Sequence, residues 1–171
     1  IMSIGSGSCY VEAKTFNFYE FKNLTCLDFS KHRITELAPV VFDKFKMTSK
    51  PINLICGDPH EYFKKYEKQK FDLIFMCAAF HHFEKPEYLL NLLIKKLNVN
   101  GYIIIIGEPY INFFEKIKYL NKNLLKYILN YKKFRSYFTF DELISGVISK
   151  DKKIEDNIRS ISSYKNLFKK F

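Results

Sequence analysis

The sequence predicts an α/β fold, with a doubly wound, mostly parallel sheet and helices on both faces. Short apolar runs alternate with longer amphipathic segments along residues 1–109, which is the pattern of repeated strand-helix-strand units. A glycine or an aspartate directly follows four of the five runs, at Gly5, Asp28, Gly57 and Gly107. The chain of 171 residues fits one domain, since domains usually contain roughly 100–200 residues.

Five strands are expected, over residues 1–4, 24–27, 52–56, 71–76 and 102–106. The last run is Tyr102 followed by four isoleucines. A run of this kind is typical of a strand covered on both faces, so we expect this strand to be buried.

Four helices are expected between the strands, over residues 8–21, 30–47, 59–69 and 86–97. Pro39 lies inside the second helix and predicts a kink or break, because proline removes a hydrogen bond and clashes with the preceding turn. The fourth helix begins with Pro86 in a first-turn position and ends before Asn100 and Gly101.

Residues 110–171 are expected to form a basic, mainly helical extension of the same domain. They contain 14 Lys and Arg against 6 Asp and Glu, whereas residues 1–109 contain 14 against 12. We attribute this surplus to compositional bias in preference to a phosphate-binding or lipid-binding surface. Apolar spacing predicts a long helix over 110–134 that packs across the sheet, with membrane or partner docking as the alternative. A capping box at Thr139 and Glu142 predicts a further short helix, and residues 150–171 have a weak helical pattern.

The remaining composition indicates a cytoplasmic protein. The four cysteines stand alone in or beside apolar runs, which favours reduced core residues over disulfides or a zinc site. No apolar run approaches the roughly 20 residues needed to span a bilayer, and the chain does not start with a signal peptide. Because the sequence opens inside a strand, we expect that an upstream segment has been removed or omitted.

Candidate binding residues follow the predicted strands, at the sheet edge where open α/β folds bind ligands. Gly5, Ser6 and Gly7 form a glycine turn after the first strand, and Asp28 ends the second strand about 21 residues later. A carboxylate in that position can accept hydrogen bonds from both ribose hydroxyls. This pair predicts a nucleoside-bearing cofactor, and NAD, FAD and S-adenosylmethionine all remain compatible with it.

Further residues distinguish these cofactors. Tyr10 occupies the third position of the dinucleotide fingerprint, where a pyrophosphate site requires a small residue for close helix packing, so NAD is less favoured. Asp58 places a second carboxylate after the third strand, where it could accept from an adenine amino group. The segment from Cys77 to Phe83, with Ala78, His81 and His82, follows the fourth strand, and Glu108 follows the fifth.

In this order of motifs, residues 1 to about 110 resemble the class I S-adenosylmethionine-dependent methyltransferases, which have a Rossmann-like fold. Cys9 stands where the family often has a third glycine, and the tail lacks the family's closing antiparallel strand pair, so we expect a truncated chain or a divergent tail. The resemblance implies S-adenosylmethionine as cofactor and a role for seven residues: Gly5, Ser6 and Gly7 line the methionine part, Asp28 holds the ribose, Phe29 packs on the adenine, Asp58 reads the adenine amino group, and Ala78 contacts the cofactor through its backbone.

His81 and His82 are the candidate catalytic residues. Histidine titrates near neutral pH and can act as a general base, and the resemblance implies that this loop faces the methyl acceptor. Loop or substrate-contact histidines are the alternative. A metal site is not expected, because adjacent residues cannot comfortably share one ion and no second ligand cluster is visible.

The sequence thus predicts methyl transfer to an oxygen or nitrogen atom of a small-molecule acceptor by direct displacement. Glu108 is a further candidate for contacting this acceptor, with a structural role as the alternative. A nucleic-acid acceptor is less favoured, since no binding motif of that kind is recognisable. An NAD-dependent oxidoreductase and a catalytically degenerate cofactor-binding protein remain as alternative functions.

Overall fold

The structure, a computed structural model, describes residues 1–109 and 161–170. It divides into two compact units. The first consists of Ile1–Phe80 and Lys85–Glu108, and the second of His81–Glu84 and Pro109–Phe171. The helix expected over 110–134 and the capping box at Thr139 lie outside the described residues. The division into residues 1–109 and 110–171 of one domain stays a prediction.

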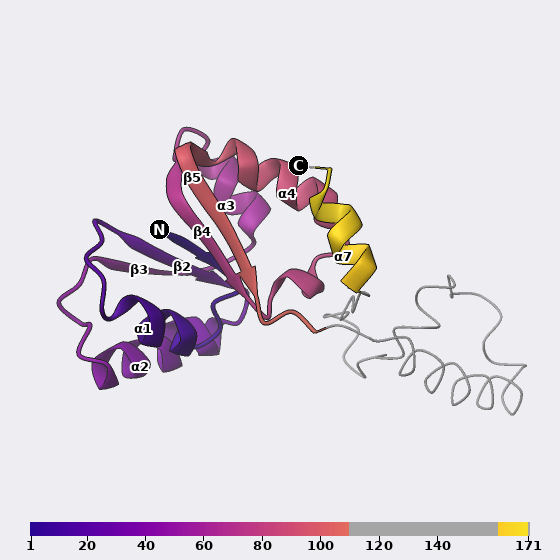
Figure 1. Ribbon diagram of the computed structural model, residues 1–171. Coiled ribbons are helices and arrows are strands. Elements are labelled where there is room, and N and C mark those ends of the chain that lie inside the picture. Colours follow the sequence, from indigo (N-terminus) through magenta and orange to yellow (C-terminus); the bar gives the residue numbers. More distant parts are fainter. Residues whose placement is uncertain (110–160, 171) are drawn as a thin grey trace, which may run out of the picture. The chain divides into compact units, whose positions relative to one another are not determined.

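Five parallel strands form the sheet of the first unit (Figure 1). All five expected strands are confirmed, and their spatial order is β3-β2-β1-β4-β5. Four of them end within one residue of the expected bounds, whereas the fifth begins five residues earlier than expected. Their bounds are β1 (Met2–Ile4), β2 (Leu24–Asp28), β3 (Ile52–Cys56), β4 (Phe71–Cys77) and β5 (Leu97–Ile106).

Helices cover both faces of this sheet, as predicted (Figure 1). One face carries α1 (Tyr10–Phe16), the π-helix η1 (Arg33–Leu37) and α2 (Ala38–Lys44). The other carries α3 (Pro59–Lys65) and α4 (Pro86–Lys95), and the short 3₁₀ helix η2 spans Phe80–His82. From β1 the chain proceeds through β2 to β3 on one side of the sheet, and from β4 it proceeds to β5 on the other side. The neighbours β1 and β4 therefore form a topological switch point. Open α/β sheets bind ligands in the crevice at such a point.

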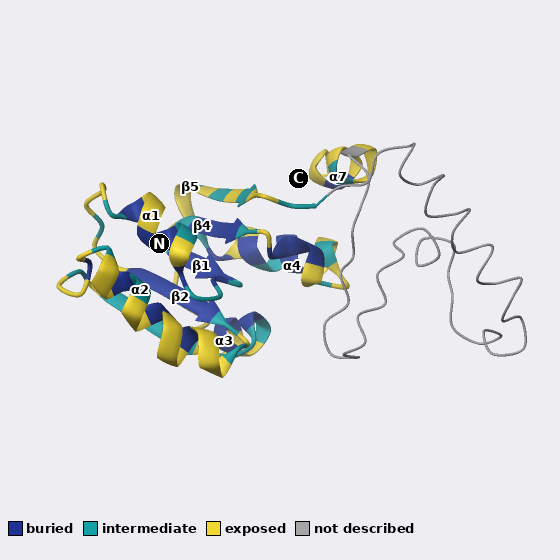
Figure 2. Cartoon of the chain, turned by 90° about the horizontal axis from the view of Figure 1, so that it is seen from below, coloured by how far each residue is buried: buried dark blue, intermediate teal, exposed yellow. Residues whose placement is uncertain are grey.

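Buried side chains concentrate on β1, β2 and β4 (Figure 2). Ala13, Phe16 and Phe42 pack from α1 and α2 against Cys26 and Phe75 of the sheet. The predicted irregularity at Pro39 is confirmed, because the π-helix ends at Leu37 and α2 continues with Pro39 in its first turn.

The first helix is shorter than the predicted 8–21. Cys9 precedes it with φ 59° and ψ 24°, a left-handed conformation that cannot continue into a helix interior. The helix ends at Phe16, where the Lys50 ammonium donates to the carbonyls of Asn17 and Tyr19 at 2.7 and 3.1 Å.

Lysines from elsewhere in the chain cap two further helix C-termini. Buried Lys96 donates to the carbonyls of Phe63, Tyr66 and Glu67 at 3.1, 3.3 and 2.7 Å, at the end of α3. Lys70 donates to the carbonyl of Lys95, the last residue of α4. A cation in this position satisfies carbonyls that have no partner within the helix and interacts favourably with the helix dipole.

The expectation that residues 102–106 are covered on both faces is wrong for the described residues. Tyr102, Ile104 and Ile106 are 69%, 41% and 45% exposed, and burial alternates along β5 (Figure 2). Their register with Leu73, Phe75 and Cys77 of β4 places them on the α1 face. The fourth helix also ends earlier than predicted, at Lys95, and β5 begins at Leu97.

In the second unit, α7 (Ile161–Phe168) falls within the range of the weak helical pattern. The rings of Tyr164 and Phe168 stack with centroids 6.3 Å apart, and the Tyr164 hydroxyl donates to the Pro109 carbonyl at 3.5 Å. Across residues 1–109 and 161–170, no helix combines the length and the apolar character that crossing a membrane requires.

Candidate functional site

The glycine turn after β1 packs directly against the loop after β4. The amides of Gly5 and Ser6 donate to the Leu27 carbonyl at 2.8 and 3.2 Å, which ties the turn to β2. Gly5 has φ +68°, and a Cβ at this position would lie 2.5 Å from Cβ of Ala79. No side chain fits between these two strand ends, so glycine is required there.

Asp28 binds the glycine turn through its carboxylate. One oxygen, Oδ2, accepts from the Gly7 amide at 2.7 Å, and Oδ1 accepts from the Ser30 amide at 2.8 Å. The spacing of 21 residues seen in the sequence thus becomes a direct contact. Each carboxylate oxygen has lone pairs for a second hydrogen bond, so Asp28 can accept from a pair of vicinal hydroxyls while it keeps the turn in place.

Near the Asp28 carboxylate there is an unpaired polar atom and open space for a ligand. The Ser6 hydroxyl oxygen is buried and makes no hydrogen bond within the described residues, although buried polar groups are normally paired. A Cβ built at Gly57, after β3, would meet nothing within 4 Å. An unpaired hydroxyl and an open strand end fit a polar ligand that lies across the strand ends.

Phe29 and Asp58 lie at the ends of β2 and β3. Phe29 is 62% exposed, so its ring is available for a planar ligand. Asp58 caps α3, since Oδ1 accepts from the amides of His60 and Glu61 at 2.6 and 3.2 Å. Within residues 1–109, Oδ2 of Asp58 accepts no hydrogen bond from the protein, so helix capping leaves this oxygen for a ligand.

The loop after β4 is fixed from β5. Glu108 Oε1 accepts from the amides of Ala79 and Phe80, both at 2.9 Å, which is the structural role considered for this residue. Ala78 is exposed and has a left-handed backbone with φ 48°. Its amide donates to the Ile106 carbonyl at 2.9 Å, so only its carbonyl remains for a backbone contact with a ligand.

His81 and His82 belong to the second unit with residues 83 and 84. Their ring centroids lie 4.0 Å apart, with His81 buried and His82 exposed. The strand ends of the first unit therefore do not include them, and their catalytic role stays a prediction.

Glu12 is a buried acid near this site that nothing in the sequence predicts, because an acid in the first turn of a helix is usually a surface residue. It is 2% exposed, and its Oε1 accepts from the Ser3 hydroxyl at 2.6 Å. Burial raises the pKa of Glu12 above its ordinary value; the Ser3 hydrogen bond opposes this rise and the Asp28 charge adds to it.

Cys77 is the last residue of β4, and the charges of Glu12 and Glu108 act on its thiol. Burial and the charges of Glu12 and Glu108 raise the pKa of this thiol. A thiol with a raised pKa stays protonated near neutral pH, so Cys77 is not a candidate nucleophile.

Other features do not belong to this site. Within residues 1–109 and 161–170, no three His, Cys, Asp or Glu side chains form a group that could hold a metal ion. A hollow of about 980 Å³ lies beside β3 and the C-terminal end of α3, with Thr25, Ile52 and Tyr66 in its wall. It shares no residue with the strand ends described above.

Comparison with known families and structures identifies the family and the fold of the chain. Residues 2–105 match the family described as a methyltransferase domain. The plantazolicin methyltransferase BamL, in complex with a triazolic desmethylPZN analog and SAH, is 20% identical with a TM-score of 0.56; the match covers 97% of this chain and 51% of that chain. An S-adenosylmethionine-dependent methyltransferase from Thiobacillus denitrificans, in complex with S-adenosyl-L-homocysteine, is 21% identical with a TM-score of 0.53, over 72% and 47%.

A putative methyltransferase from Bacillus halodurans has the same fold, with 11% identity and a TM-score of 0.60 over 99% of this chain and 60% of that chain. No curated protein sequence matches the chain. The chain spans about half the length of BamL, at 51%. At these identities the similarity to solved structures concerns the fold.

Proposed function

Because the chain belongs to the methyltransferase domain family, which it matches over residues 2–105, we propose that it transfers a methyl group from S-adenosylmethionine to an oxygen or nitrogen atom of a small-molecule acceptor. The observation that carries this proposal is the hydrogen bond of 2.7 Å between the Gly7 amide and Asp28 Oδ2. It joins the glycine turn to the carboxylate suited to a ribose, and both lie at the switch point of the sheet.

The residues at the strand ends fit this cofactor. Asp28 retains lone pairs for the two ribose hydroxyls, and the buried Ser6 hydroxyl needs a partner that the methionine part would supply. Phe29 offers an exposed ring for the adenine. Asp58 Oδ2 would accept a hydrogen bond from the adenine amino group, and the Ala78 carbonyl would supply the backbone contact.

The cofactor supplies a methyl group activated by its positively charged sulfur. The chain then has to bind the cofactor, orient the acceptor in line with the methyl group and exclude water. For a hydroxyl acceptor, His81 or His82 would accept the proton as a general base. A carboxylate acceptor is already ionised and needs no such base.

The same site weakens the alternative of an NAD-dependent oxidoreductase. Tyr10 begins α1, and its ring packs edge-on against Phe45 with centroids 5.6 Å apart. This bulky residue occupies the place where a pyrophosphate site needs glycine or alanine. The buried acid Glu12 also adds negative charge near the turn when ionised, which disfavours a diphosphate and favours a cationic cofactor.

Calorimetric titration of the chain with S-adenosylmethionine, S-adenosylhomocysteine and NAD tests this function. Binding of the first two in preference to NAD, lost in Asp28→Ala and retained in Glu20→Ala, supports the proposal. Glu20 is exposed and makes the same change of charge away from the strand ends. Preferential binding of NAD, or full binding by Asp28→Ala, contradicts it.

A further inference from the structure

The strand β3 has one open edge. In the described part of the chain it is the last strand of the sheet and pairs with β2 alone. At one end of this pairing the Leu24 amide donates to the Pro51 carbonyl at 3.0 Å, and at the other end the Gly57 amide donates to β2 at 3.0 Å. Successive residues of a strand direct their backbone groups to opposite sides, so every second residue of β3 faces away from β2. These residues are Ile52, Leu54 and Cys56.

The hollow of about 980 Å³ lies along this edge. Four consecutive residues of β3, from Ile52 to Ile55, line it. Their side chains alternate between the two faces of the sheet, so a hollow that touches all four includes the edge of the strand itself. Ile52 and Leu54 are partly buried against the core beneath α1 and α2, which places Asn53 and Ile55 on the face of α3. An extended segment that pairs with β3 would therefore have one row of side chains on each face.

Lysines at the end of α3 give this hollow a positive charge. Lys64, Lys65 and Lys68 line it, all three are exposed, and none forms an ion pair within residues 1–109 and 161–170. Residues 64–70 contain four Lys and one acid, Glu67, whereas residues 1–109 together contain 14 Lys and Arg against 12 Asp and Glu. The positive surplus of the first unit is thus concentrated beside the hollow, which a uniform compositional bias does not explain.

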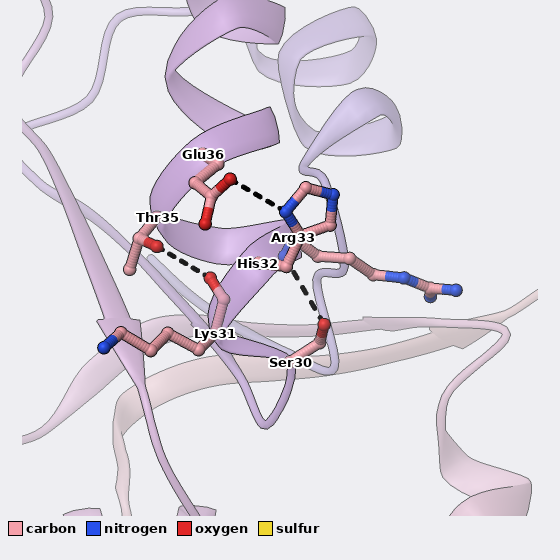
Figure 3. Close-up of polar contacts among 6 residues, drawn as sticks. All are labelled: Ser30, Lys31, His32, Arg33, Thr35 and Glu36. Carbon is pink, nitrogen blue, oxygen red and sulfur yellow. Dashed lines mark hydrogen bonds and ion pairs between the residues drawn. The ribbon is translucent and has the colours of Figure 1, made fainter.

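A basic cluster elsewhere in the first unit differs from this one. It lies at the start of η1, where His32 pairs with Glu36 at 3.0 Å and the Arg33 amide donates to the Ser30 hydroxyl at 3.4 Å (Figure 3). None of these residues lines the hollow. The lysines at the end of α3 are therefore the cations that lie beside an open strand edge.

We propose that β3 and the end of α3 form a docking site for an extended acidic segment of a partner protein, which adds a strand to the sheet. The edge supplies main-chain hydrogen bonds, and the lysines select acidic side chains on the face of α3. Apolar side chains of the same segment cover Ile52 and Leu54 on the opposite face. A second copy of this chain fits less well, because two sets of these lysines would repel each other. The site is separate from the methyl transfer proposed above and does not depend on it.

The probe is an acetylated and amidated octapeptide of alternating glutamate and valine, titrated into the chain by calorimetry. We expect it to bind, and we expect Lys64→Gln combined with Lys68→Gln to weaken its affinity by about tenfold, because two exposed charge pairs are lost. Lys14→Gln is the matched control. It removes a positive charge from an exposed position on α1, and it should leave the affinity within about twofold of that of the wild type.

Two methylated forms of the octapeptide separate strand addition from attraction between charges. In an extended peptide all glutamates direct their amides to one side and all valines to the other, so N-methylation of either set removes donors from one side only. We expect one methylated peptide to bind more than about tenfold less tightly, since several hydrogen bonds to β3 are lost. The other should bind about as tightly as the unmodified peptide. Amide hydrogen exchange at Ile52 and Leu54 should also slow when the peptide binds.

The opposite results overturn the proposal. Equal affinities of the two methylated peptides, or unchanged exchange at Ile52 and Leu54, show that the peptide does not pair with β3. Absence of binding by the unmodified octapeptide overturns the docking site as a whole. A single-stranded oligouridylate is the competing probe: if it displaces the peptide and depends more strongly on Lys64 and Lys68, the hollow is a nucleic-acid site instead.

Discussion

Substitution of three glycines at the strand ends by alanine should produce a graded loss of stability. Gly57 has an ordinary backbone conformation and open space around it, Gly7 has φ +54° with no atom closer than 3.9 Å to a Cβ, and Gly5 has φ +68° with Cβ of Ala79 at 2.5 Å. The series therefore separates backbone strain from steric overlap.

The magnitudes follow from these environments. At Gly57, alanine should be neutral or stabilise the fold by about 0.4–1 kcal/mol, because it restricts the unfolded chain. At Gly7 the left-handed conformation costs about 1–2 kcal/mol, which leaves a small net destabilisation. At Gly5 the overlap with Ala79 adds about 1–3 kcal/mol to the same strain, so we expect a net loss of about 2–4 kcal/mol.

Urea unfolding of the three variants measures these free energies. Gly5→Ala should also weaken binding of S-adenosylhomocysteine, since relief of the overlap displaces the loop that carries Ala78. The added variant Ala79→Gly removes the clashing Cβ and should recover part of the stability of Gly5→Ala, as a coupling of about 0.5–3 kcal/mol in a double-mutant cycle. A loss at Gly5 no larger than the loss at Gly7, or no coupling to Ala79, refutes the packing of these two strand ends.

Three further predictions concern residues around the site. Lys96→Met should lower the free energy of unfolding by about 2–3 kcal/mol, because the buried Phe63 carbonyl and the partly buried Glu67 carbonyl at the end of α3 lose a charged donor. Exposed Lys68→Met, the control, should change this free energy by less than about 0.5 kcal/mol in urea unfolding, and equal effects contradict the capping role. The raised pKa of Glu12 means that the folded protein favours the protonated form of this acid. The contribution of protonated Glu12 to stability is therefore full below the ordinary glutamate pKa, and it is lost as pH rises through the raised pKa. Glu12→Gln should therefore gain stability relative to the wild type over this pH window in urea titrations, and a constant difference excludes the shift. Glu108→Ala should weaken binding of S-adenosylhomocysteine more than Glu108→Gln, which keeps an Oε1 acceptor for Ala79 and Phe80; similar affinities in the titration contradict the positioning of this loop by Glu108.

Much of the first unit is predictable from local sequence pattern. The five apolar runs locate the strands because a parallel sheet covered by helices requires them, and Pro39 marks the change from π-helix to α-helix. The contact between Gly7 and Asp28 follows from the same reasoning, since the carboxyl ends of neighbouring parallel strands meet at one edge.

The differences arise where contacts distant in sequence decide the local structure. Lys50 and Lys96 terminate α1 and α3 from other elements, and no local pattern reveals them. The run 102–106 is apolar, but hydrophobicity does not tell which face of β5 a neighbour covers. The position of Glu12 near the site also depends on the tertiary fold, because Glu12 resembles an ordinary helix surface residue in the sequence.

The most direct test of the central claim is to map the binding of S-adenosylhomocysteine by amide chemical shifts of the isotope-labelled chain. With the cofactor bound at the carboxyl ends of the strands, large shifts are expected there, with Gly7, Ser30 and Gly57 among them, and small shifts at Lys50 and Asn98 near the opposite ends. Shifts centred on the hollow beside Tyr66, or saturable binding without shifts at the glycine turn, would contradict the assignment of the strand ends as the cofactor site.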